Sequence, residues 1–329
     1  MTRSLQRESF CAMGTICGVA ATAESDDVFR ARGALDAALG EVAACERVLS
    51  RFDPRSDLSR LNRASGEWVA VDTRLIEALA AAVGGRTNTC GLFDPTILPA
   101  LAAVGYDRSF ELLTERAAEP LDGWNGGAFI DVDAGSGRAR VERGAAVDLG
   151  GIGKGFAATR ALLAMRIAWP ALPGGLVDLG GDIAVWGEPP ESGPWRVDIA
   201  DPRAHDRVYG TLELTRGGIA TSGRNMRRFG PERGLHHLID PATGQPAAAG
   251  PLSVTVVAES ATEAEPYATA LGISTIDTAR DLLTSRPEVA ALLIPEFDRP
   301  VALGPFPLAR QDPTARVVVN TQVGRFPWH

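Results

Sequence analysis

The sequence predicts a mixed α/β (α+β) fold, in which helices pack against mixed and antiparallel sheets. Residues 145–165 have the pattern of a strand, a glycine-rich turn and a helix, in that order. The pentapeptide VDLGG of residues 147–151 recurs thirty positions later, at 177–181. Because the two copies flank one helix, they predict a βαβ unit with parallel strands and both glycine ends at one edge. Three β-rich segments within residues 195–222 then indicate antiparallel pairing.

The remaining elements follow from apolar periodicity and from turn residues between the periodic segments. We expect helices at residues 26–49, 74–87, 156–167, 259–272 and 277–285. We expect a hairpin at 129–141 and strands at 9–21 (with a bulge or a close backbone approach at 13–15), 145–149, 176–186, 195–200, 208–214, 218–222, 252–258, 288–294 and 316–320. Ser56 or Asp57 is expected to cap a short helical turn. Asp94, which precedes Pro95, is expected to cap a helix that begins near Thr96.

Length and charge limit the classes of function. With 329 residues, 45% of them hydrophobic, the chain is long enough to bury a substantial core. The formal net charge of −8 argues against a nucleic-acid partner, because a phosphate backbone needs a basic surface. No apolar run is long enough to span a bilayer, so we expect no stable membrane insertion.

The cysteines and the first residues bear on the cellular compartment. Cys11, Cys17, Cys45 and Cys90 form no C-x-x-C pair, which suggests neither a zinc site nor a disulfide framework and fits reduced thiols. The N-terminal segment as given lacks the apolar core of a secretory signal. We therefore expect a cytoplasmic protein.

The glycine-rich turn is the candidate ligand-binding segment. Gly150, Gly151, Gly153 and Gly155 surround Lys154 at the predicted helix start. Glycine permits positive φ and a close approach of backbone to ligand, and a helix N-terminus favours phosphate. The turn does not match the P-loop, because glycine follows the lysine, and it does not match the dinucleotide fingerprint G-x-G-x-x-G. A turn that serves only tight strand-to-helix packing is the alternative.

Three further residues carry candidate chemistry. Glu265 precedes Pro266, a favoured first helical residue, and Thr269 lies one helical turn further on. A carboxylate and a hydroxyl on one helix face suit a hard cation such as Mg²⁺, and the alternative is a capped helix start with an exposed threonine. His236 and His237 would point to opposite faces of a strand, and His237 is either a site residue or a buried core residue.

Eight short segments in chain order form a pattern that none of them carries alone. They are Met13-Gly14-Thr15, residues 50–62, residues 91–96, residues 148–155, Gly180-Gly181-Asp182, Thr221-Ser222-Gly223, residues 237–244 and residues 265–269. Together they resemble the FAD:protein FMN transferase family, also called ApbE-like, across nearly the whole chain. The resemblance implies an ApbE-like fold, a single domain over residues 1–329 with two intertwined lobes and an FAD cleft between them.

The resemblance also implies an activity and a set of site residues. The family moves FMN from its substrate FAD to a threonine hydroxyl of an acceptor protein, such as a redox or electron-transfer flavoprotein, and releases AMP with the help of Mg²⁺ or Mn²⁺. Family positions assign FAD binding to Met13, Phe52, Leu92, Phe93, Asp94, Asp148, Lys154 and Leu252. They assign metal binding to the Gly151 carbonyl, Glu265 and Thr269. His237 matches the histidine near the reacting phosphate, where it or a nearby aspartate would take the proton of the incoming hydroxyl.

Two residues depart from the family pattern. Glu265 stands where most of the family has aspartate, and its extra methylene changes the reach of a metal ligand. Thr159 stands where an aspartate often follows the glycine turn. Two alternatives therefore stay open beside the transferase: a flavin-binding protein without transfer activity, and a Mg²⁺-dependent FAD pyrophosphatase that gives FMN and AMP.

Overall fold

A computed structural model of the chain describes residues 3–108, 113, 121, 123–224, 228–230 and 235–309. The helices in these residues are α1 (Val28–Leu49), α2 (Asp57–Arg63), α3 (Thr73–Asn88), α4 (Leu98–Ala103), α5 (Gly153–Ala168), α6 (Ala261–Gly272) and α7 (Ile276–Thr284). The strands are β1 (Arg3–Ala12), β2 (Thr15–Glu24), β3 (Val69–Ala70), β4 (Ile130–Asp133), β5 (Arg138–Val141), β6 (Gly174–Leu179), β7 (Ile183–Gly187), β8 (Trp195–Asp201), β9 (Ala204–Leu214), β10 (Arg216–Gly223), β11 (Arg228–Phe229), β12 (Leu235–His236), β13 (Ile239–Asp240), β14 (Gln245–Pro246), β15 (Ser253–Ala258), β16 (Ala290–Ile294), β17 (Val301–Leu303) and β18 (Leu308–Ala309). The strand expected at residues 316–320 lies outside the described residues.

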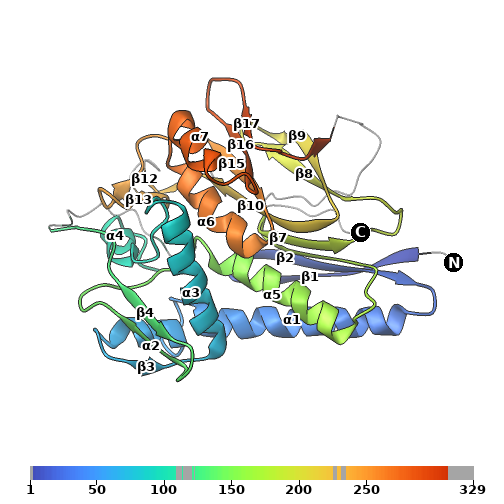
Figure 1. The fold of residues 1–329 in the computed structure, drawn as a ribbon, viewed down its shortest axis with the longest axis horizontal. Helices are drawn as coiled ribbons and strands as arrows, with labels where there is room; N and C mark the ends of the chain where they lie inside the picture. Colours follow the sequence, from blue (N-terminus) through green and yellow to red (C-terminus); the bar gives the residue numbers. More distant parts are fainter. Residues whose placement is uncertain are drawn as a thin grey trace.

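An eight-stranded sheet forms the centre of the fold, in the order β1-β2-β6-β7-β10-β15-β16-β17. Every neighbouring pair in it is antiparallel. Helices α1, α5 and α6 lie along one face, and the small sheet β18-β9-β8 covers the other (Figure 1). The alternation along β6 shows this division, because Val177 packs with the helices and Leu176 with the small sheet. The mixed α/β fold with antiparallel sheets is confirmed.

Small apolar residues bring the helices close to the sheet and to one another. Along α1 the buried residues include Ala31, Ala34, Ala38 and Cys45, at helical spacing. These side chains are small, so a second helix can pack close to this face of α1. The helices expected at 26–49, 74–87, 259–272 and 277–285 are confirmed to within a few residues as α1, α3, α6 and α7.

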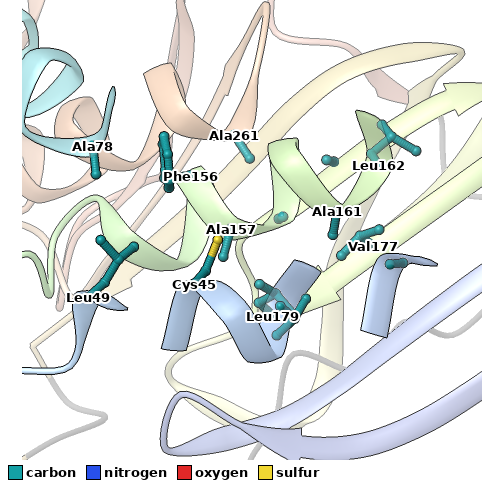
Figure 2. Packing of buried hydrophobic residues seen from close by; sticks show 14 of the residues in the cluster. Cys45, Leu49, Ala78, Phe156, Ala157, Ala161, Leu162, Val177, Leu179 and Ala261 are labelled. Carbon is teal, nitrogen blue, oxygen red and sulfur yellow. The ribbon is translucent and has the colours of Figure 1, made fainter. Parts of the chain in front are cut away.

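Helix α5 is the central helix of this layer and packs on its neighbours from several sides. Figure 2 shows Ala157 and Ala161 of α5 among residues of α1 and β6. Where α5 meets α6, a Cβ on Gly155 would lie 2.2 Å from the carbonyl oxygen of Ala261, so only glycine permits this contact. The close crossing places the start of α5 directly beside the first turns of α6.

The single strand expected at residues 9–21 is instead a hairpin of β1 and β2. Its turn is formed by Met13 and Gly14, with φ of 50° and 68°, the left-handed values that a tight two-residue hairpin turn requires. The expected bulge at this point is therefore wrong, because the chain reverses there. The reversal carries Met13 to the end of the sheet where the glycine-rich turn lies.

The predicted βαβ unit is also wrong. Residues 145–149 form no strand, and only an isolated bridge joins Ile97 to Ala146. The strand expected at residues 176–186 is divided at Gly180 and Gly181 into β6 and β7, which pair antiparallel as a hairpin. Thus the VDLGG repeat marks two chain corners and not two parallel strands. The expected hairpin at 129–141, by contrast, is confirmed as β4 and β5.

One expected helix start and one expected cap are wrong, and a second expected cap is confirmed. Helix α6 begins at Ala261, where Ser260 accepts a hydrogen bond from the Glu263 N–H at 3.2 Å, so Pro266 lies inside the helix. Helix α4 has no side-chain cap, which excludes the capping role expected of Asp94. Ser56 caps α2 and accepts from the Ser59 N–H at 3.0 Å, as predicted.

Candidate active site

A cavity of about 480 Å³ lies where the glycine-rich turn, the start of α5 and the middle of α6 meet. Eleven of the twelve predicted site residues line it, namely Met13, Phe52, Leu92, Phe93, Asp94, Asp148, Gly151, Lys154, His237, Glu265 and Thr269. Leu252 does not line the cavity, although the next residue, Ser253, does. The backbone N–H of Leu252 donates instead to Ile294 of β16, at 2.9 Å. The eleven residues that line the cavity are spread over the sequence from Met13 to Thr269, and the fold brings them together.

At the first glycine corner, residues 150–155, neighbouring side chains lie very close to the backbone. None of Gly150, Gly151, Gly153 and Gly155 has positive φ, so that part of the prediction is wrong. A Cβ on Gly150 would lie 2.8 Å from Oδ1 of Asp148, and a Cβ on Gly151 would lie 2.9 Å from Oγ1 of Thr269. Glycine is thus needed because side chains from its own turn and from α6 press against the backbone.

The second glycine corner, between β6 and β7, does use positive φ, at Gly180 (73°) and Gly181 (100°). The Gly181 N–H donates to Oδ1 of Asp178 at 2.8 Å, which closes the turn. Both corners line the same cavity, so the prediction that the two glycine ends lie together is confirmed. They meet because α5 leads away from the first corner and β6, which packs against α5, returns to the second.

Lys154 lies between two buried carboxylates. Its Nζ contacts Oδ2 of Asp182 and lies 3.0 Å from Oε1 of Glu265, while the carboxylate side chains are only 2% and 4% exposed. The other oxygen of Glu265 accepts the backbone N–H of Gly155 at 2.7 Å, in the first turn of α5. The N–H group that was expected to face a phosphate is therefore bonded to a carboxylate from α6.

Burial makes this centre electrostatically unusual. It raises the pKa of Glu265 to about 8, with a further contribution from the charge of Asp182. Burial likewise raises the pKa of Asp178 to about 7, again with Asp182 adding to the effect. Two carboxylates, Asp182 and Glu265, face one ammonium, so the ionised cluster carries an excess negative charge away from solvent. A second cation would relieve it.

The residues assigned to a metal fit a hard divalent cation. A Cβ on Gly151 would lie 2.9 Å from Oγ1 of Thr269, so the two residues are neighbours, and Glu265 lies one turn before Thr269 on α6. A carbonyl, a hydroxyl and a carboxylate are oxygen donors of the kind that Mg²⁺ binds. Among the described residues no group of three or more His, Cys, Asp and Glu side chains is arranged to hold a metal. Any such ion here would thus depend on backbone and hydroxyl oxygens.

Asp94 joins two loops at the cavity wall. Its Oδ1 accepts the Thr96 N–H at 2.8 Å and the Thr96 hydroxyl at 2.7 Å, and its Oδ2 accepts the Gly127 N–H at 2.7 Å. The side chain is 3% exposed. These bonds fix the loop that presents Leu92 and Phe93 to the cavity.

The two adjacent histidines occupy different environments. His236 is buried, its Nε2 lies 3.2 Å from the carbonyl oxygen of Ala247, and burial lowers its pKa. His237 is half-buried and lines the cavity. Of the two histidines only His237 lines the cavity, but it follows the end of β12, so alternation along a strand is not the reason.

Sequence reasoning did not single out Arg51, Asp178 and Asp182 as site residues. Asp178 and Asp182 lie in the second VDLGG copy and just after it, so the repeat was a usable signal for both. Arg51 forms an ion pair with Asp148, with its Nε 2.7 Å from Oδ2. Nothing in the sequence distinguishes it from Arg55, four positions further on.

Comparison with known proteins places this geometry in a family. A model of the ApbE family matches residues 13–293. The chain belongs to the ApbE family. It is 30% identical over 305 residues to a FAD:protein FMN transferase of Treponema pallidum, covering 86% of this chain and 82% of that protein. It is 28% identical over 268 residues to a FAD:protein FMN transferase of Klebsiella pneumoniae, covering 78% and 75%.

Solved structures agree with the ApbE assignment. The crystal structure of the ApbE protein from Thermotoga maritima superposes with a TM-score of 0.80 at 28% identity, covering 91% of this chain and 97% of that chain. The flavin transferase ApbE from Vibrio cholerae shares the fold, with a TM-score of 0.76 at 24% identity over 92% and 99% of the two chains.

Within the described ranges, every helix is too short or too polar to cross a bilayer.

Proposed function

We propose that this ApbE family member is a FAD:protein FMN transferase. The observation that carries the proposal is the meeting of the Gly150-Gly151 turn with Glu265 and Thr269 of α6 on one wall of the cavity, beside Lys154. This wall combines a close backbone approach, an ammonium and oxygen donors, which is what a diphosphate with a divalent cation needs. The names of the curated relatives support the same reaction.

In this reaction the hydroxyl oxygen of an acceptor threonine forms a bond to the phosphorus of the FMN half of FAD. The P–O bond of the diphosphate breaks, AMP leaves with the bond electrons, and the hydroxyl proton passes to a base. We assign that base to His237, the cavity histidine. Met13, Phe52, Leu92, Phe93, Asp94 and Asp148 would contact FAD, and Lys154 would neutralise charge that develops on the phosphate oxygens. Leu252 would act only indirectly, through its neighbour on β15.

The Gly151 carbonyl, Glu265 and Thr269 would hold the divalent cation, Mg²⁺ or Mn²⁺. When bound, that ion supplies charge stabilisation for the diphosphate and for AMP as the leaving group.

We propose that the domain extends over residues 1–329, with the cavity between two intertwined lobes. Four free thiols fit the reducing cytoplasm as the place of reaction. The acceptor would be a redox or electron-transfer flavoprotein with an accessible threonine.

One observation favours a second candidate, a flavin-binding protein without transfer activity. Both carboxylate oxygens of Glu265 already have partners, Lys154 and the Gly155 N–H. A cation must compete with both, so a poor metal site would leave FAD bound and intact. Hydrolysis of FAD to FMN and AMP is the third outcome, with water in place of the threonine.

A single incubation distinguishes these functions. The protein is mixed with FAD, Mg²⁺ and a flavoprotein acceptor, and the acceptor is weighed by mass spectrometry while AMP is measured by chromatography. We expect one FMN added to the acceptor for each AMP released, and no product when the metal is chelated. Intact FAD would support the binding protein, and free FMN with unlabelled acceptor would support the pyrophosphatase.

A further inference from the structure

Arg51 connects three parts of the cavity wall. Its Nε lies 2.7 Å from Oδ2 of Asp148, and its Nη2 donates to the carbonyl oxygen of Tyr106 at 3.0 Å. The side chains of Arg51 and Asp148 are only 7% and 10% exposed. Desolvation makes an ion pair this deep costly unless its geometry is good and further hydrogen bonds support it. It joins the loop after α1 to the glycine turn and to the loop after α4.

The guanidinium also supports an aromatic platform. Its central carbon lies 4.2 Å from the centre of the Phe52 ring and 4.8 Å from that of Tyr106. The two rings are tilted against each other, with centroids 6.5 Å apart. Phe52 lines the cavity and is 43% exposed, so it presents ring surface that the protein itself does not cover. Planar heteroaromatic ligands stack on such surfaces.

The backbone that carries Arg51 is held firmly. The Ser56 hydroxyl donates to the carbonyl oxygen of Ser50 at 2.5 Å. The hydroxyl of Ser59 lies 3.3 Å from the carbonyl oxygens of both Ser50 and Arg51. At the other end, Oδ1 of Asp148 accepts the Gly150 N–H at 2.8 Å. The Phe52 ring is thus linked to the glycine turn through three interactions: its cation–π contact with Arg51, the ion pair of Arg51 with Asp148, and the hydrogen bond of Asp148 with the Gly150 N–H.

We propose that Arg51 is a positioning residue of the FAD site: it fixes the separation between the Phe52 ring surface and the glycine turn, so that one planar ring and the diphosphate of FAD bind together. This inference rests on the proposed function. Lysine cannot replace arginine here, because one ammonium cannot reach Asp148 and the Tyr106 carbonyl while also lying flat against two rings.

The test compares Arg51→Lys with Arg55→Lys, a matched control in the same loop whose side chain is 88% exposed and contacts only Asp53 among the described residues. FAD affinity is measured by flavin fluorescence, kcat and KM by AMP release, and folding by thermal melting. We expect Arg51→Lys to weaken FAD binding and raise KM by about tenfold or more, with kcat at saturating FAD within about threefold of wild type. Arg55→Lys stays at wild-type values.

A second variant makes the test independent of the first. Asp148→Asn breaks the same ion pair from the other side and also changes a residue assigned to FAD. Because both changes remove the Arg51–Asp148 ion pair, the loss of FAD affinity in the double variant should be clearly smaller than the product of the two single losses. Binding of FMN and AMP separately shows which half of FAD carries the stacked ring, because only that half loses affinity in Arg51→Lys.

Several results would overturn the proposal. FAD binding by Arg51→Lys within about twofold of wild type would do so, as would a fall in kcat at unchanged KM or single effects that multiply in the double variant. If wild-type protein binds no FAD at all, the proposed function itself is wrong, and this inference fails with it. A wild type that binds FAD beside an unaffected Arg51→Lys variant rejects the inference alone.

Discussion

The carboxylate of Glu265 on α6 accepts the backbone N–H of Gly155 on α5, with 2.7 Å between Oε2 and the nitrogen. This bond ties the two helices that form the candidate metal-binding wall, at the point where Gly155 lets them cross. It also uses one of the N–H groups that the first turn of a helix leaves without an intrahelical partner. Glu265 thus has a structural role in addition to the role proposed toward a cation.

Glu265→Asp should separate these two roles. Aspartate is one methylene shorter, so we expect it to lose the bond to Gly155 and to lower the free energy of unfolding by about 1 kcal/mol. It restores the residue that the family resemblance implies at this position, so we expect AMP release to stay at the wild-type level or to rise. Chemical denaturation and an AMP assay measure the two effects, and a large loss of activity with intact folding would contradict the assignment.

Thr269→Ala should remove an oxygen donor without disturbing the helix, because alanine is a good helix former. We expect AMP release to fall by about tenfold or more and the Mg²⁺ concentration for half-maximal activity to rise. Thr284→Ala, an exposed threonine on α7, is the control. Unchanged turnover and unchanged Mg²⁺ dependence in Thr269→Ala would show that the hydroxyl is not a metal ligand.

Asp178→Asn should change how stability depends on pH. The folded-state pKa of Asp178, about 7, is above its ordinary value of 3.8, so the folded protein holds this proton more tightly than the unfolded chain does. The resulting stability is fully present below pH 3.8 and is lost as pH rises from 3.8 through about 7. Asparagine does not ionise and keeps an oxygen that accepts the Gly181 N–H. We expect the variant to gain on the order of 2 to 4 kcal/mol relative to wild type between pH 4 and pH 8.

Thermal melting at several pH values measures this difference. Asp36→Asn, at an exposed position on α1, is the control and should follow wild type closely. If Asp178→Asn and wild type show parallel stability curves from pH 4 to pH 8, Asp178 is ionised in the folded protein over this range. Burial would then not raise its pKa as described.

Gly155→Ala should be strongly destabilising, because the new Cβ would lie 2.2 Å from the Ala261 carbonyl oxygen. Overpacking of this kind costs about 1 to 3 kcal/mol or more, and it should also lower FAD affinity by separating α5 from α6. Gly33→Ala on α1 is the matched control, since nothing lies within 4 Å of its Cβ position. There alanine should stabilise by about 1 kcal/mol through helix propensity. Equal melting temperatures for the two variants would be evidence against a tight crossing.

Local features of the fold were predictable, and its pairings were not. The helix at α1 and the cap at Ser56 depend on residues close together in the sequence, so both predictions were correct. The strand partners of β6 were not, because antiparallel pairing with β2 depends on residues about 150 positions away. The VDLGG repeat correctly indicated two corners at one cavity but did not determine strand direction.

The candidate site shows the same division. The glycine-rich turn singled out Lys154, and the spacing to Thr269 singled out Glu265, yet their contact joins residues 111 apart and only the fold reveals it. Leu252 was assigned by position and does not line the cavity, whereas the next residue, Ser253, does, although the backbone of both residues pairs with β16. Arg51 was missed since its importance comes from a partner 97 positions later, Asp148, and not from its own neighbours.

The central claim is that the glycine-rich turn and α6 hold the diphosphate of FAD together with a divalent cation. A crystal soaked with FAD and Mn²⁺ tests it most directly, because the anomalous signal locates the metal. We predict a single Mn²⁺ bound by the Gly151 carbonyl oxygen, a Glu265 oxygen and the Thr269 hydroxyl, with the diphosphate beside Lys154. A diphosphate bound elsewhere, with the anomalous peak away from α6, would contradict the account.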